Sequence, residues 1–83
     1  MTHTPHDLHA EFPNDVAILH DLKLGDMHFN RRAEAYHNIN REIHRIDAGI
    51  DAASDAHTEE LKKSRLALLD EIADMIAVVR KGA

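Results

Sequence analysis

The sequence predicts an all-α protein: an antiparallel, coiled-coil-like helical hairpin that follows a short N-terminal helix and self-associates. Two long segments repeat apolar residues at helical spacing, and a short stretch of small and polar residues separates them. The 83-residue chain has no cysteine and three aromatic side chains, so its interior must be aliphatic and no disulfide can brace it. A domain of this size buries a modest fraction of its surface, and oligomerisation commonly buries the additional surface that stability requires.

The first expected helix, at about residues 14–24, is short. Asn14 or Asp15 can accept hydrogen bonds from the free N–H groups at its start, so either is a suitable N-cap. Gly25 closes the segment, because glycine tolerates the positive φ that is common after a helix. A helix this short is not stable alone and must pack on the rest of the chain.

The second expected helix spans about residues 26–48, with Asp26 as its N-cap. Its apolar residues follow a heptad repeat, which predicts a seam that packs against another helix. Those hairpin-core positions are Phe29, Tyr36, Ile39, Ile43 and Ile46. Arg32 falls on the same seam and weakens it, although its methylene groups can lie on apolar surface while the charged group stays in water.

The third expected helix spans about residues 55–81 and follows the link "GIDAASDA", in which Ser54 or Asp55 can act as the cap. One apolar stripe completes the hairpin core, and it is interrupted by Arg65. Its members are Leu61, Leu68, Ile72, Met75 and Val79. Since the link is short and the two long helices are similar in length, they are expected to pack antiparallel.

A second apolar stripe runs beside the first on the third helix, at Leu66, Leu69, Ala73 and Ile76. One antiparallel partner needs only a narrow seam, so this wider apolar face predicts a further contact. We interpret the stripe as the oligomer interface of a dimer or larger assembly. The alternative is that the first helix folds back and covers the stripe within one chain.

Four sequence pieces in order resemble the YdcH-like family of small bacterial proteins, whose domain is of unknown function. They are "EFP" at 11–13, "DLKLGDMHF" at 21–29, "YHNINREIHRIDAG" at 36–49 and "LKKSRLALLDEI" at 61–72. The resemblance implies a helical hairpin or coiled coil and supplies no catalytic residue, cofactor or substrate. Members tend to have leucine near Arg32 and Asn38 to Asn40, and lysine at Leu69. The first difference loosens the seam of the second helix, the second adds apolar surface to the third, and both favour association.

The histidines raise the question of a metal site. Residues 1–11 are expected to form a flexible tail before a single helical domain at 12–83, and the metal-binding alternative rests on three tail residues, His3, His6 and His9. Thr2, Thr4 and Pro5 favour an unstructured tail instead. On a helix, His37 and His44 would lie about 10.5 Å apart along the axis, too far for one metal ion to join them. No cofactor is expected.

Composition also bears on the class of function. The sequence contains no Gly-rich phosphate loop, nucleophile elbow or HExxH motif, so no enzyme activity is expected. No apolar run is long enough to cross a bilayer, and no signal-peptide pattern precedes the domain, which makes a cytoplasmic protein without membrane contact the default expectation.

The leading hypothesis is a structural or interaction module that homo-oligomerises and presents a helix face to an unidentified protein partner. A net charge of −5 argues against nucleic acid as the main partner. The nucleic-acid alternative would use basic side chains gathered on one face of the oligomer. These are Arg31, Arg41, Arg45, Lys62 and Lys63.

Overall fold

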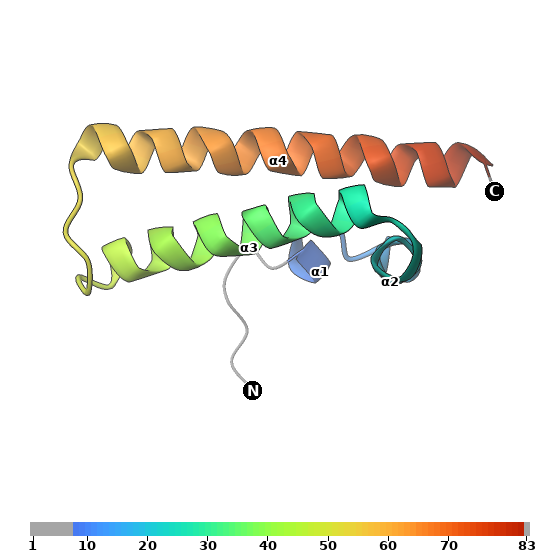
Figure 1. The fold of residues 1–83 in the computed structure, drawn as a ribbon, viewed down its shortest axis with the longest axis horizontal. Coiled ribbons are helices and arrows are strands. Elements are labelled where there is room, and N and C mark those ends of the chain that lie inside the picture. Colours follow the sequence, from blue (N-terminus) through green and yellow to red (C-terminus); the bar gives the residue numbers. More distant parts are fainter. Residues whose placement is uncertain (1–7, 83) are drawn as a thin grey trace.

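A computed structural model describes residues 8–82 as four helices, and it confirms the all-α hairpin preceded by a short helix. α3 (Met27–Asp47) and α4 (Asp55–Gly82) run antiparallel and are joined by a loop at one end (Figure 1). α1 (Leu8–Glu11) and α2 (Val16–Gly25) precede them, and α2 contacts both long helices near the opposite end. All three helices expected from the sequence begin and end within two residues of their predicted bounds.

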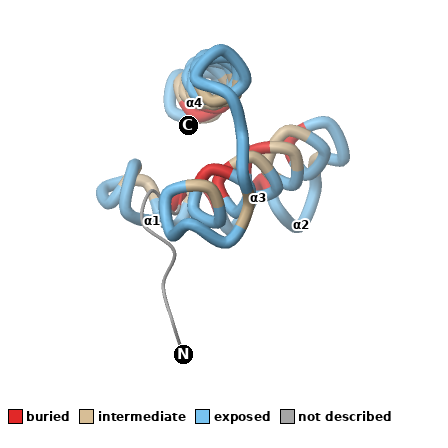
Figure 2. The backbone as a smooth tube through the Cα atoms, turned by 90° about the vertical axis from the view of Figure 1, so that its left-hand side faces the viewer, coloured by how far each residue is buried: buried red, intermediate tan, exposed pale blue. Residues whose placement is uncertain are grey.

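The core lies between the facing sides of α3 and α4, where buried positions meet (Figure 2). Tyr36 on α3 and Ile72 on α4 are 0% exposed and form its centre. Of the other predicted hairpin-core residues, Phe29 and Ile43 are buried and the rest are half-buried. The half-buried set is Ile39, Ile46, Leu61, Leu68, Met75 and Val79.

The packed domain already includes Leu8, four residues before its predicted start at Phe12. The sequence assigned residues 8–11 to the tail, whereas in the structure they form α1 and Leu8 is only 5% exposed, within the core. The reason is the spacing of Leu8 and Phe12, which lie one helical turn apart and reach the same apolar surface. Leu19 and Leu22 on α2 complete this part of the core.

Two of the expected helix caps are present. The Asp26 side chain accepts a hydrogen bond from the Phe29 backbone N–H at 3.0 Å, and Ser54 Oγ accepts one from the His57 N–H at 3.1 Å. Asp15 precedes α2 but makes no side-chain cap, because its carboxylate instead forms an ion pair with Arg80 near the end of α4. That pair ties the start of α2 to the last turns of the hairpin.

Gly49 is the glycine that needs positive φ. Its φ is 77°, and the Gly49 and Ile50 N–H groups donate to the carbonyls of Ile46 and Arg45, which is the Schellman arrangement that ends α3. Gly25, which was expected to play this part for α2, remains within the helix and has no positive φ.

Replacing Gly49 by alanine should therefore lower the free energy of unfolding by about 1–2 kcal/mol, because a Cβ is strained at this φ. No atom would clash with that Cβ, so the backbone conformation is the whole cause. Gly25→Ala is the matched control: it lies in a helix with open space around it and should stabilise the protein by about 0.4–1 kcal/mol. Urea denaturation of both variants measures the difference, and equal effects would contradict the assignment.

Candidate functional site

In the structure, the predicted oligomer stripe is buried at one end and exposed at the other. Ile76 is 2% exposed and belongs to the core, where α2 packs on the hairpin. Leu69 is half-buried against the same core, and Ala73 is half-buried. Leu66, by contrast, is 61% exposed. The first predicted helix therefore covers the C-terminal end of the stripe within one chain and leaves Leu66 uncovered.

The two arginines that interrupt the predicted seams have polar partners on the opposite helix. Arg32 Nε on α3 lies 2.6 Å from Glu71 Oε2 on α4, and charge attraction rather than a well-aligned hydrogen bond joins them. Arg65 on α4 donates to the side-chain oxygen of the buried Asn40 at 3.3 Å. Polar pairs at a helix seam favour one register over others. Sequence reasoning found both arginines and neither partner.

Two further pairs hold the loop end of the hairpin. His57 Nε2 on α4 lies 2.9 Å from Glu42 Oε2 on α3, a contact that sequence spacing alone did not indicate. Arg45 Nε lies 2.8 Å from Asp51 Oδ2 in the loop. The hydrogen bond from Arg45 holds the pKa of the Asp51 carboxyl below its ordinary 3.8 and raises the pKa of Arg45.

The five basic residues of the nucleic-acid alternative do not form one patch within a chain. Arg31, Arg41 and Arg45 are exposed on α3, while Lys62 and Lys63 are exposed on α4. Helical periodicity places Arg45 opposite the core residue Tyr36 on α3, and Lys63 opposite Ile72 on α4. These two side chains therefore face away from each other on the outer sides of the hairpin.

The histidine candidates are also separated. His3 and His6 lie outside the described residues, and His9 is exposed on α1. His37 is exposed on α3, with its ring edge-on to Tyr36 at a centroid distance of 5.8 Å, and His44 is exposed one heptad further on. Within residues 8–82, no three His, Asp or Glu side chains are placed to hold a metal ion.

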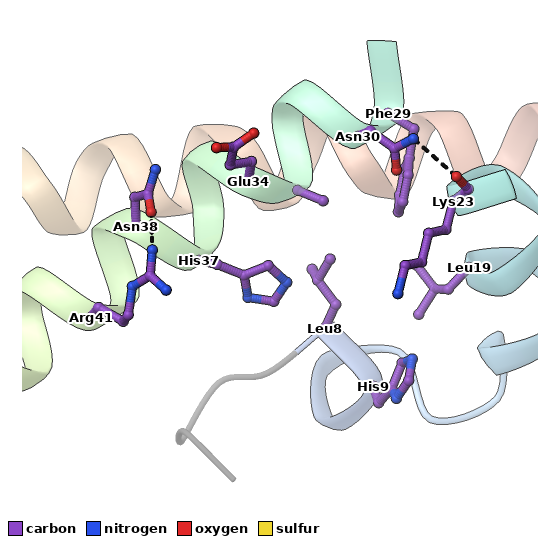
Figure 3. A pocket seen from close by; sticks show the side chains of 11 residues that line it. Leu8, His9, Leu19, Lys23, Phe29, Asn30, Glu34, His37, Asn38 and Arg41 are labelled. Carbon is purple, nitrogen blue, oxygen red and sulfur yellow. Dashed lines mark hydrogen bonds between the residues drawn. The ribbon is translucent and has the colours of Figure 1, made fainter. Parts of the chain in front are cut away.

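A groove of about 510 Å³ opens between α1, α2 and α3 (Figure 3). Apolar side chains from all three helices line it, namely Leu8, Leu19, Phe29 and Ala33. Polar and charged side chains surround them, namely His9, Lys23, Asn30, Glu34, His37, Asn38 and Arg41. Asn30 Nδ2 donates to the Lys23 carbonyl at 2.9 Å and joins α3 to α2 beside the groove. The sequence did not indicate this hollow, because α1 had been assigned to the tail.

These features define a small helical-hairpin protein whose two long helices meet through an aliphatic seam crossed by polar pairs. Residues 29–76, which contain most of α3, the loop and most of α4, match the family described as protein of unknown function DUF465, and the chain belongs to that family. YdcH-like proteins are members of this family, so the resemblance seen in the sequence is confirmed. No curated protein and no solved structure matches the chain. None of the helices in the described part of the chain has the length and apolar character needed to span a bilayer.

Proposed function

We propose that this helical domain is a structural module that homo-oligomerises through α4 and presents a helix face to a protein partner, without catalysis. The surface of association is the outer stripe, defined as Leu66, Leu69 and Ala73. The observation that carries the proposal is the 61% exposure of Leu66 beside two half-buried apolar neighbours on the same side of α4. An antiparallel copy laid on this stripe would remove all three side chains from water.

We propose the corner between α2 and α3 as the partner surface. Leu24 and Met27 are each 74% exposed there, three residues apart, at the end of the hairpin opposite the loop (Figure 1). Large apolar side chains that remain in water are common anchors of protein interfaces. A photoreactive group at Met27 should therefore crosslink the chain in its own cells to a protein other than itself.

Replacing Leu66 by lysine should convert the oligomer into a monomer. A charge placed in the centre of an apolar interface is desolvated without a partner, so self-association should weaken by about tenfold or more. Leu66 is a better target than Ile76, because lysine at the buried Ile76 would disrupt the core. Sedimentation at micromolar concentration measures the oligomeric state of the wild type and the variant.

Val78→Lys is the matched control. Val78 is 71% exposed on the same helix, but it lies about a third of a turn around α4 from Leu66. The control should sediment like the wild type, and circular dichroism should show native helicity for both variants. A wild-type protein that sediments as a compact monomer would refute the proposal, as would equal weakening by the two substitutions.

A further inference from the structure

We propose that the groove between α1, α2 and α3 binds a small organic anion, a carboxylate on an apolar body. This inference does not depend on the oligomer proposal, because the groove lies on the α1–α2 side of α3 and the outer stripe lies on α4. Its volume of about 510 Å³ falls in the usual range for small-molecule sites, roughly 300–1,000 Å³.

The charge of the lining points to an anion. Lys23 and Arg41 contribute two permanent positive charges, and Glu34 contributes one negative charge. Among the described lining residues, these permanent charges therefore sum to +1 (+2 − 1). This local balance is opposite to the net charge of −5 carried by the whole chain.

The cationic groups are also available. The Lys23 ammonium makes no hydrogen bond or ion pair with any other described residue. Within residues 8–82, the His37 ring lies edge-on to the Tyr36 ring, and the Arg41 guanidinium donates to the neutral Asn38 side chain. Figure 3 shows the Lys23 and His37 side chains extending toward the hollow from α2 and α3. A carboxylate between them would gain charge-assisted hydrogen bonds.

The apolar lining favours a hydrocarbon body over a small inorganic ion. Leu8, Leu19 and Phe29 are buried in the core, and Figure 3 shows the first two facing the same hollow as Lys23. A short aliphatic chain laid on them would leave water, while the charged end stays at the polar rim. The site therefore selects amphiphilic anions.

Octanoate is the probe, and the intact chain is titrated with it by calorimetry and by backbone amide NMR. We expect saturable one-to-one binding, with shifts at Leu8, Leu19 and Ala33. Octan-1-ol, which keeps the chain and lacks the charge, and acetate, which keeps the charge and lacks the chain, should each bind about tenfold more weakly or worse.

Lys23→Gln should weaken octanoate binding by about tenfold, because it removes a charge-assisted contact. Lys62→Gln is the matched control on α4, outside the groove, and should leave the affinity unchanged. Unsaturable uptake, equal binding of octan-1-ol, or equal weakening by the control would overturn the proposal. So would octanoate affinity that falls as protein concentration rises, since a second copy of the chain would then fill the groove.

Discussion

Replacing Ile72 by alanine should lower the free energy of unfolding by about 2–5 kcal/mol. Ile72 is 0% exposed and lies at the centre of the seam between α3 and α4. Truncating a fully buried aliphatic side chain loses its transfer free energy and leaves a cavity that neighbours only partly fill. Small domains have total stabilities of about 5–15 kcal/mol, so this single change should remove a large share of that stability. Urea denaturation followed by circular dichroism measures it.

Val78→Ala supplies the matched control for that measurement. Both residues are β-branched and lie on α4, but Val78 is 71% exposed and makes no part of the core. The control should change the stability by no more than about 0.5 kcal/mol. If both substitutions had the same effect, α4 would not pack through the side that carries Ile72.

The second large effect is expected from pH. The formal charge is −5 with all eight histidines neutral, and it reverses to +3 if all eight are protonated. The reference pKa of histidine in peptides is about 6.5, so we expect this change over roughly pH 7.5 to 5.5. Solubility should therefore be lowest close to the sequence pI of 5.8, while helical content is kept because the seam is aliphatic.

The folded structure supports the second half of that expectation. The pKa of the Asp51 carboxyl is lowered by its hydrogen bond from Arg45. A lowered pKa contributes stability that is present above the unfolded value near 3.8 and is lost as the pH falls through the folded value. That loss lies well below the histidine range. Light scattering and circular dichroism from pH 8 to 5 test the separation, and a collapse of helicity without precipitation would contradict it.

Much of the fold could be predicted from the sequence because its elements are set locally. The apolar repeat from Phe29 to Ile46 identified α3, and the caps at Asp26 and Ser54 marked where two helices begin. These signals depend on residues within a few positions of one another. The family resemblance over the hairpin could be recognised for the same reason, because its motifs lie along the apolar repeat. The family match over residues 29–76 confirms it.

The groove could not be predicted, because it depends on contacts between distant parts of the chain. Leu8 looked like part of a polar tail, and only its docking on Leu19 and Phe29 turned it into one wall of a hollow. Asp15 looked like a helix cap, yet its carboxylate is taken by Arg80, which lies 65 residues further along the chain. Neither contact leaves a periodic signal in the sequence.

The sequence by itself determined that the chain is helical, where α2, α3 and α4 begin and end to within two residues, and which side of α3 and α4 is apolar, because backbone capping and the 3.6-residue repeat act over a single turn or two. Tertiary structure alone decided which arginine meets which partner and how much of the second stripe α2 covers. Ile76 and Leu66 are both apolar residues on that stripe, yet one is 2% exposed and the other 61%. The difference comes from where α2 docks, and that position is set by packing across the whole chain.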